Sequence, residues 1–283
     1  MISDKLNDPA STVLNNARVA LEKWEGTEVG IHPDSNPALT LGSGTAIALR
    51  AKAGDPFILM KREEINDLLR EAGVPEDRHL TIADYEALRV IHELPTADAM
   101  KKAIADSNNP KFIRTLTDSE RIARLNIEIR KQALVIDQEI KNELEKLDIV
   151  KRDNGSGADP NKVKTKLDEI YASLTDNKYE ALISFGFNAA TALIGRNLVT
   201  ALANGDHWAA FRDILIGSNP TKGVGAKGLQ KRRFGEAGKF SPFTGEGGRP
   251  VSAVELETIL NKYTAEEAIS FVDFFVRKNV PLE

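Results

Sequence analysis

The stretch WEGTEVGIHPDSNPALTLGSGT, residues 24–45, decides how this chain begins to fold. The segment before it carries apolar residues at intervals of three or four, the spacing of an amphipathic helix: Val13, Leu14, Ala17, Leu21 and Trp24. Ser11 is the expected N-cap of this helix, and Gly26 is the expected stop. Beyond Gly26 the helical period fails, and the turn-forming run PDSNP at 33–37 separates two short β-prone segments. The stretch therefore predicts a helix that ends at a glutamate, followed by a small sheet or hairpin.

Most of the remaining chain has the sequence signals of helices. Residues 46–115 predict short helices and turns, and a capping-box pattern at Thr117 begins an apolar repeat that predicts one long helix over 116–147. The segment 152–162 has the composition of a loop, and 178–193 is apolar on nearly all sides, which is typical of a buried helix. Shorter helices are expected at 196–204, 206–216, 252–262 and 264–278. The predicted fold class is α+β, mostly α-helical.

Composition excludes several classes of protein. The 283 residues carry a formal net charge of −4, which argues against a protein that binds nucleic acid through its phosphate backbone. The chain has no cysteine, so it has no disulfide and no thiolate site. No apolar run reaches the length of a membrane span, and the N-terminal segment lacks the apolar core of a signal peptide. The four histidines show no metal-ligand spacing, so we expect no metal and no cofactor.

The order of the first segments resembles that of the phage-type lysozymes, the glycoside hydrolases that include phage endolysins. In that family the first helix ends in Glu-Gly, and a small sheet then carries an aspartate, a threonine and a glycine-rich strand end. The matching residues here are Glu25-Gly26, Asp34 and the TLGSGT segment at 40–45. Asp34 follows Glu25 by nine positions and Thr40 follows Asp34 by six, which is the spacing of the family's catalytic triad. The Gly-Ser-Gly sequence at 42–44 is also similar to a segment of the lysozyme-type domain of the bacteriocin pesticin.

Two later blocks extend the resemblance in the same order. ALISFGFNAAT at 181–191 is similar to the buried central helix of the family's larger lobe, with Asn188 in the place of an amide that lines the cleft. GLQKRRFGEAGKF at 228–240 is similar to a late family block that contains paired arginines, here Arg232 and Arg233. The alternative interpretation is structural: Asn188 would be a satisfied core amide, and the arginines would tie helices together through a glutamate.

The resemblance implies one lysozyme-like domain over 1–283, with two lobes, a small N-terminal sheet and a long interlobe helix. Its expected parts are a small lobe at 11–115, the connecting helix at 116–147, a helical lobe at 163–240 and a C-terminal extension at 241–283. Three departures are visible. Thr45 stands where the family commonly has a histidine, the connection at 46–115 is longer than usual, and 241–283 has no counterpart.

The residue types in the opening stretch suit glycoside hydrolysis, which needs an acid on the leaving oxygen and a base or nucleophile on the opposite side. Glu25 is the expected acid, because the negative end of the helix dipole disfavours its ionised form. Asp34, in a polar turn, is expected to stay ionised, and Thr40 offers a hydroxyl that can hold a water. Gly42 and Gly44 would let a sugar approach the backbone. Outside this context, a glutamate at a helix end and an aspartate in a turn are ordinary surface residues.

The leading hypothesis is a peptidoglycan muramidase that hydrolyses the β-1,4 bond between N-acetylmuramic acid and N-acetylglucosamine, with Asn188 and Arg232 among its substrate-binding residues. We expect synthesis in the cytoplasm without a signal peptide and action on the periplasmic cell wall after delivery by a phage or a secretion system. The expected partners are glycan strands, with a delivery protein or an inhibitor as further candidates; neither nucleic acid nor membrane insertion is expected. A non-catalytic wall-binding or baseplate module and a helical interaction protein are the alternatives.

Overall fold

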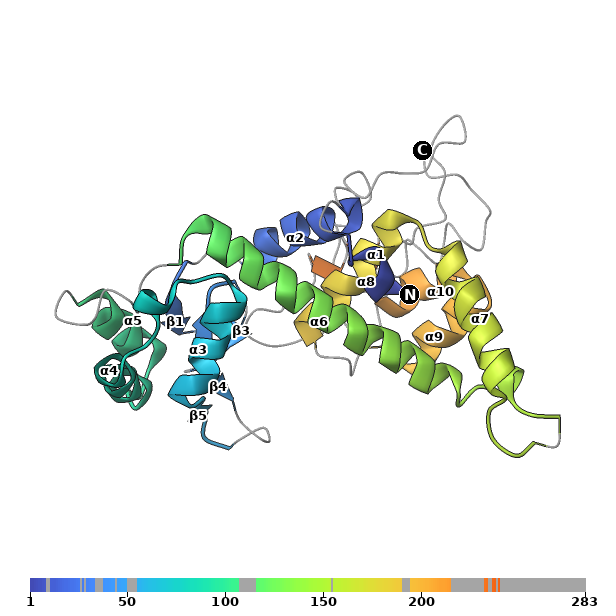
Figure 1. The fold of residues 1–283 in the computed structure, drawn as a ribbon. Coiled ribbons are helices and arrows are strands. Elements are labelled where there is room, and N and C mark those ends of the chain that lie inside the picture. Colours follow the sequence, from blue (N-terminus) through green and yellow to red (C-terminus); the bar gives the residue numbers. More distant parts are fainter. Residues whose placement is uncertain are drawn as a thin grey trace, which may run out of the picture. The chain divides into compact units, whose positions relative to one another are not determined.

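The computed structural model is a mostly helical α+β protein with a small antiparallel sheet (Figure 1). It describes residues 1–8, 11–25, 27, 29–33, 38–43, 45–49, 55–106, 116–153, 155–189, 194–214, 232–233, 236–237 and 239. Within these ranges, only the backbone is described at 24, 25, 188, 189, 208, 211 and 212. The C-terminal extension at 241–283, with the helices predicted there, lies outside the described residues.

The chain divides into two compact units. We call Arg18–Ile129 the sheet unit, and Met1–Ala17 together with Arg130–Glu283 the helical unit. Two helices contribute residues to both units: α2 (Thr12–Glu25) and α6 (Asp118–Leu144).

The sheet unit contains both sheets of the described chain. Strands β1 (Ile31–Pro33), β2 (Leu39–Leu41) and β3 (Thr45–Ala46) form an antiparallel sheet in the order β1-β2-β3. Strands β4 (Ala48–Leu49) and β5 (Ile58–Leu59) form a second antiparallel pair. The helical elements that follow are α3 (Arg62–Glu71), the 3-10 helix η1 (Glu76–Arg78), α4 (Ile82–His92) and α5 (Ala97–Ala105). Helix α5 packs beside β1.

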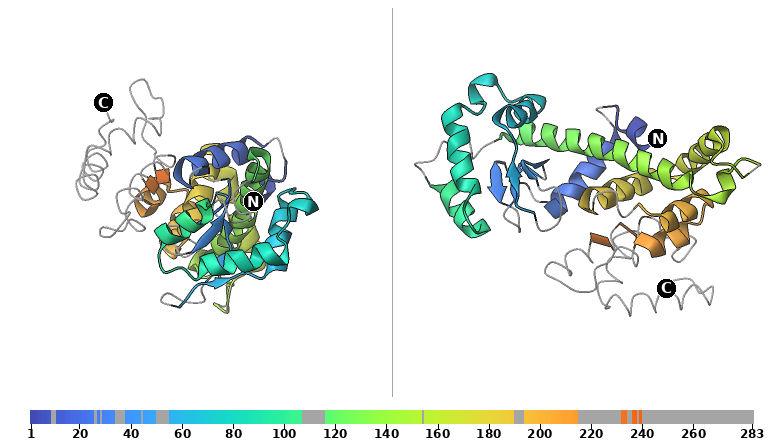
Figure 2. Two further views of the ribbon diagram at one scale, coloured as in Figure 1. Left: turned by 90° about the vertical axis from the view of Figure 1, so that its left-hand side faces the viewer. Right: turned by 90° about the horizontal axis from the view of Figure 1, so that it is seen from below.

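The helical unit is built from shorter helices around the second part of α6. These elements are α1 (Ile2–Lys5), the 3-10 helix η3 (Asp148–Val150), α7 (Pro160–Ser173), α8 (Asp176–Ala189), α9 (Arg196–Ala203) and α10 (His207–Arg212). Helix α9 contacts both α7 and α10. Figure 2 shows the ribbon in two further views.

Local capping signals set the start of two helices as the sequence predicts. The Leu14 N–H donates to Ser11 Oγ at 3.3 Å, and α2 begins at the next residue after this cap. At α6 the Glu120 N–H donates to Thr117 Oγ1 at 3.3 Å, while the Thr117 N–H donates to Glu120 Oε2 at 2.8 Å. These reciprocal bonds satisfy two backbone donors at the helix start. The long helix predicted over 116–147 is confirmed as α6, which spans Asp118–Leu144, and α2 ends at Glu25 as predicted.

Two sequence-based expectations were wrong in detail. The segment 152–162 is not a loop throughout, because α7 begins at Pro160. Asp159 caps this helix by accepting from the Asn161 N–H at 2.8 Å, and proline at the first helical position loses no intrahelical hydrogen bond. The pair β4-β5 within 46–115 was also missed. Each of its strands is two residues long, too short to show a period-two pattern.

Strand alternation separates the two faces of the three-stranded sheet. Ile31, Leu39 and Leu41 belong to one hydrophobic cluster, which apolar residues of α3, α4 and α5 complete. His32 and Thr40 lie directly opposite each other on β1 and β2, at the alternate positions of those strands. Since successive side chains of a strand point to opposite faces, His32 and Thr40 lie on the face turned away from this cluster.

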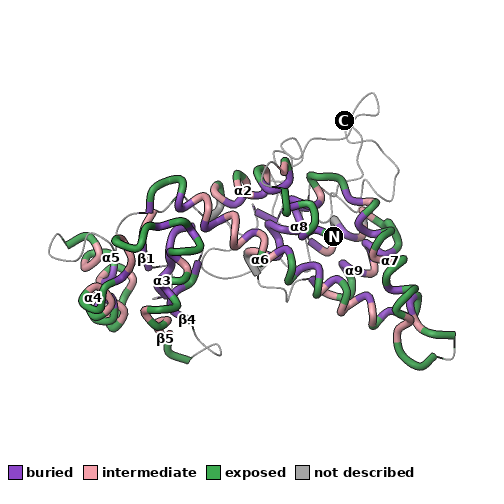
Figure 3. Tube along the Cα trace, viewed as in Figure 1, coloured by how far each residue is buried: buried purple, intermediate pink, exposed green. Residues whose placement is uncertain are grey.

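In the helical unit, a central apolar helix and a buried carboxylate organise the packing. Every residue from Tyr179 to Gly186 of α8 is buried, which confirms the prediction of a buried helix there (Figure 3). A Cβ on Gly186 would lie 2.6 Å from Ile136 Cδ1 and 2.7 Å from its Cγ1, so α8 and α6 pack at a distance that only glycine permits without a shift of Ile136.

Asp137 of α6 anchors α1 and α7 to this core. Its carboxylate accepts hydrogen bonds from the Ile2 N–H at 3.0 Å, the Ser3 N–H at 2.9 Å, Ser3 Oγ at 2.7 Å and the Tyr171 hydroxyl at 2.7 Å. Asp137 is 6% exposed and Ile2 is fully buried. The Tyr179 hydroxyl donates to the Tyr171 carbonyl at 2.7 Å, and burial together with the Asp137 charge raises the pKa of Tyr179 to about 12. Burial and the Asp137 charge also raise the pKa of Tyr171, so both tyrosines are neutral donors at physiological pH.

We expect Asp137→Ala to lower the free energy of unfolding by about 3–5 kcal/mol, because it leaves the buried donors of Ile2, Ser3 and Tyr171 without their acceptor. Urea unfolding followed by circular dichroism measures the loss. Asp168→Asn on α7 is the matched control, since Asp168 is an exposed carboxylate paired with Lys164 and should contribute less than about 1 kcal/mol. A loss at position 137 no larger than that of the control would contradict the anchoring role.

Candidate active site

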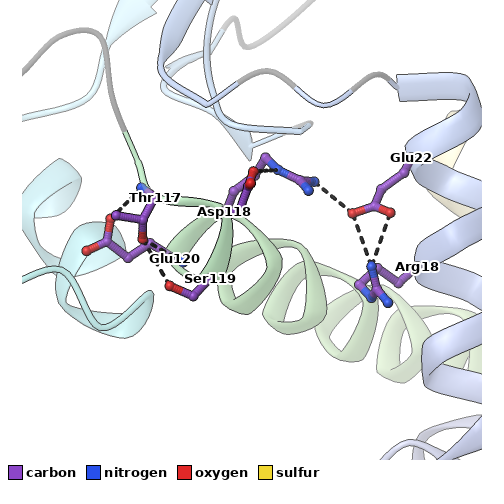
Figure 4. Close-up of polar contacts among 7 residues, drawn as sticks. Arg18, Glu22, Thr117, Asp118, Ser119 and Glu120 are labelled. Atoms are coloured by element: carbon purple, nitrogen blue, oxygen red, sulfur yellow. Dashed lines mark hydrogen bonds and ion pairs between the residues drawn. The ribbon is translucent and has the colours of Figure 1, made fainter.

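The C-terminal turn of α2 is fixed by an ion-pair network one turn before Glu25. Arg18 Nη1 donates to both carboxylate oxygens of Glu22, at 3.2 and 3.1 Å, and Arg121 Nη1 donates to Glu22 at 2.8 Å. Arg121 is 5% exposed, and its Nε lies 3.7 Å from Asp118. Figure 4 shows Arg18 and Glu22 on α2 near the capped start of α6. The network holds the end of α2 against the first turns of α6, and so fixes the backbone position of Glu25.

Thr40 and Gly42 lie at the middle strand of the three-stranded sheet, in the same unit as this helix end. Thr40 is 8% exposed and is placed between His32 of β1 and Ala46 of β3 in the pairing register. Gly42 has φ +58°, in the left-handed region, and its N–H donates to the Gly30 carbonyl at 3.0 Å. This position favours glycine on conformational grounds alone. The backbone conformation of the turn after β2 therefore explains Gly42, one of the two glycines that were predicted to let a sugar approach.

The other predicted site residues are described to different extents by the structure. The backbone of Glu25 is described and its side chain is not, while Asp34 and Gly44 lie outside the described residues. Asn188 lies on α8, described by its backbone alone. Glu25, Thr40 and Gly42 therefore belong to the sheet unit, and Asn188 and Arg232 belong to the helical unit.

Arg232 is held in a buried polar cluster with α8. Its Nε donates to Glu236 Oε1 at 2.9 Å and its Nη2 donates to the Ser184 carbonyl at 2.7 Å, while Ser184 Oγ donates to the same glutamate oxygen at 2.6 Å. Arg233 pairs with the second oxygen of Glu236 and places its guanidinium carbon 4.6 Å from the centre of the Phe185 ring. Arg232 is 3% exposed. These contacts support the structural interpretation of the arginine pair over direct contact with a substrate.

A cavity of about 250 Å³ lies in the sheet unit, and one of its polar lining residues, Arg78, is engaged in a structural ion pair. Its lining includes Ile31 and Leu41, which face the hydrophobic cluster, and it does not include Thr40. Arg78, on its wall, donates to both oxygens of Glu120 at 2.7 and 3.1 Å. Burial disfavours the ionised form of Glu120, but the hydrogen bonds from Thr117 and Arg78 outweigh burial and hold the pKa of Glu120 below its usual range. This cavity is therefore separate from the Thr40 face of the sheet.

Buried charges on α6 were missed by sequence reasoning. Arg121 and Arg124 fall on the same helical stripe as the apolar Leu125 and Ile129, and both arginines are buried. A signal was available, because Arg124 and Glu128 are spaced four residues apart and form an ion pair. Their longer-range partners could not be identified from local spacing.

The described residues contain neither a candidate metal site nor a membrane-spanning helix. In that part of the chain, no group of three histidine, aspartate or glutamate side chains is arranged to hold a metal ion. None of the helices described is both long enough and apolar enough to cross a membrane.

Comparison with known proteins adds no relative: no family model, no curated protein and no solved structure matches this chain. The resemblance to phage-type lysozymes consequently depends on the residues and spacing of the motifs themselves.

We expect Arg232→Met to reduce the free energy of unfolding by roughly 2–4 kcal/mol, because Glu236 loses one of its buried cations and the Ser184 carbonyl loses a donor. Thermal and urea unfolding measure this loss. Arg196→Met is the matched control: Arg196 is the exposed first residue of α9 in the same unit, and its loss should change stability by less than about 0.5 kcal/mol. An Arg232→Met protein of parental stability that binds glycan strands more weakly would instead favour the substrate-binding interpretation.

Proposed function

We propose that this protein is a peptidoglycan muramidase with a lysozyme-like fold, which hydrolyses the β-1,4 bond between N-acetylmuramic acid and N-acetylglucosamine. The observation that carries the proposal is the placement of the motif residues. Helix α2 ends at Glu25, and the middle strand of the small sheet that follows carries Thr40, within one compact unit. This combination accompanies the Glu25, Asp34 and Thr40 spacing that resembles the lysozyme triad.

The chemistry assigned to these residues follows from their positions. Glu25 at the C-terminal end of α2 meets the negative end of the helix dipole, which favours its protonated form and suits a general acid. Asp34 follows β1 and would act as the base that activates a water on the opposite face of the sugar. Thr40 adds a hydroxyl that can accept and donate a hydrogen bond without changing charge, which suits it to seat that water.

The surroundings of Thr40 are compatible with this role. The sheet presents His32, Thr40 and Ala46 in one cross-strand row on the face away from the hydrophobic cluster. Ala46 is exposed and His32 is half-buried, so the row is shielded only in part. A row that offers an imidazole and a hydroxyl can contact a glycan without disturbing the apolar core of the unit.

In this proposal the substrate is the glycan strand of the cell wall, and the enzyme reaches the periplasm through a phage or a bacterial secretion system. Asn188 and Arg232 are the proposed substrate-binding residues of the helical unit, although the buried contacts of Arg232 favour an indirect part for that side chain.

Glu25→Gln tests the general acid, because the amide retains size and hydrogen bonding but cannot deliver a proton. We expect turnover of purified sacculi to fall by at least ~100-fold, the usual scale of acid–base catalysis. Release of reducing sugar and mass analysis of the products measure it. Glu76→Gln, at an exposed glutamate of η1 in the same unit, should retain parental turnover. A folded Glu25→Gln protein that digests sacculi at the parental rate would remove Glu25 from the mechanism, whereas a parental protein that binds sacculi without cleaving them would indicate a wall-binding module.

The stereochemistry of hydrolysis tests the role of the second carboxylate. A water seated by Thr40 and activated by Asp34 implies single displacement, so the first product should have the inverted anomeric configuration. Proton NMR of the anomeric signals during early hydrolysis of soluble glycan strands distinguishes the two outcomes. Retention of configuration would mean that a carboxylate acts as a nucleophile, and would exclude the water-seating role of Thr40.

A further inference from the structure

Arg124 of α6 connects three parts of the sheet unit from a buried position. Its Nε donates to Thr45 Oγ1 at 3.0 Å, its Nη1 donates to Glu71 Oε2 at 2.7 Å, and its Nη2 pairs with Glu128 one turn along the helix. Arg124 is 1% exposed, so its guanidinium is shielded from solvent. One cation therefore links β3, the C-terminal residue of α3 and α6.

The geometry of arginine makes this contact directional. Burial lowers the pKa of Arg124, and the hydrogen bond and charge of Glu71 oppose that shift, so the side chain remains a cation at neutral pH. A buried cation is costly unless its donors are satisfied, and the planar guanidinium satisfies them only with partners at fixed angles. The position of Thr45 relative to α6 is consequently set by a hydrogen bond and not by apolar packing alone.

Thr45 lies close to the proposed chemistry along the strand register. It pairs with Leu41 across β2 and β3, and the next pair is Thr40 with Ala46. The short turn between these strands contains Gly42 in the left-handed conformation, and glycine restricts the backbone less than other residues do. An anchor on the β3 side of the turn is needed to hold the register at Thr40, because these strands are only two or three residues long.

We propose that Arg124 is a positioning residue for the hydrolytic site, acting through Thr45 to hold the Thr40 strand in its productive place. This inference rests on the proposed muramidase function. It also accounts for the threonine at a position where phage-type lysozymes commonly have a histidine. Arginine only donates hydrogen bonds, so its neighbour must accept one, and a threonine hydroxyl accepts without adding a second positive charge beside the buried guanidinium.

Thr45→Val tests this inference, since it keeps the shape of the side chain and removes the acceptor for Arg124 Nε. We expect kcat on soluble glycan strands to fall about tenfold with KM within twofold of the parental value, because a displacement of less than about 1 Å at a catalytic group reduces rate strongly. Thr45→Ser restores the hydroxyl and should restore kcat to within about threefold. Arg124→Lys supplies a second test, because a lysine retains the charge but not the fixed fork, and it should also lower kcat.

Arg78→Gln is the matched control. It removes the bidentate Arg78–Glu120 pair, which joins η1 to the start of the same helix. It should lower the melting temperature while kcat stays within about twofold of the parent, measured below the unfolding transition. The activity of each variant is compared with its melting temperature to separate positioning from stability.

The outcomes are distinguishable. Parental hydrolysis together with an unchanged kcat in folded Thr45→Val and Arg124→Lys proteins overturns the positioning role alone. A kcat loss in Arg78→Gln equal to that in Thr45→Val likewise overturns it, because the effect would then follow general destabilisation. Absence of hydrolysis by the parental protein overturns the proposed function, and this inference with it.

Discussion

Both units are organised around a charged side chain of α6 that is buried away from water. Because removing a charge from water costs free energy, this burial constrains the elements around each side chain. Arg124 is buried in the sheet unit and Asp137 is buried in the helical unit, and each forms hydrogen bonds with partners distant in sequence. A buried ion that loses a partner costs several kcal/mol, so its partners must reach it at the right distance and angle. Each ion thereby specifies the placement of elements that apolar packing would leave free to shift.

The same logic explains why polar clusters recur at element ends. Glu22 with Arg18 and Arg121 fixes the end of α2, and Glu236 with two arginines ties a short segment to α8. Element ends carry unpaired backbone groups and few apolar contacts, so they are the places where packing defines position least. Charge-assisted hydrogen bonds have preferred distances and angles, so they fix the positions of these ends where apolar packing does not.

Local signals predicted the helices well, because they depend on residues that are neighbours in sequence. Ser11 and the Thr117–Glu120 capping box set helix starts, and the apolar character of 178–193 on nearly all sides predicted α8 as a buried helix. The strands β4 and β5 were missed because each is two residues long and is stabilised by a partner strand. The start of α7 was misplaced because Asp159 and Pro160 have the composition of a loop although they form a cap.

For the candidate site, the helix end and the small sheet were predictable from the sequence, whereas the long-range side-chain contacts around them were not. The spacing of Glu25, Asp34 and Thr40 is local, and so are the helix and sheet that carry it. The contact between Arg124 and Thr45 joins residues 79 positions apart, and no period or motif in one sequence reveals such a pair. Arg232 shows the converse problem: its motif favoured a place beside substrate, whereas its hydrogen bonds go to Ser184 and Glu236.

The division into units bears on how a reaction at this site would be organised. The three proposed catalytic positions fall within Arg18–Ile129, and Thr40 follows Glu25 by only 15 positions. Their relative geometry therefore depends on short connections and on anchors within one unit, which are Arg121 at the helix end and Arg124 at the strand end.

Both anchors lie on α6, three residues apart and hence on the same face of that helix. A single rigid helix thus provides the common reference for the proposed acid and the proposed water-binding hydroxyl. Because a helix resists bending over one turn, it can hold two groups in register more accurately than the loops that join them in sequence.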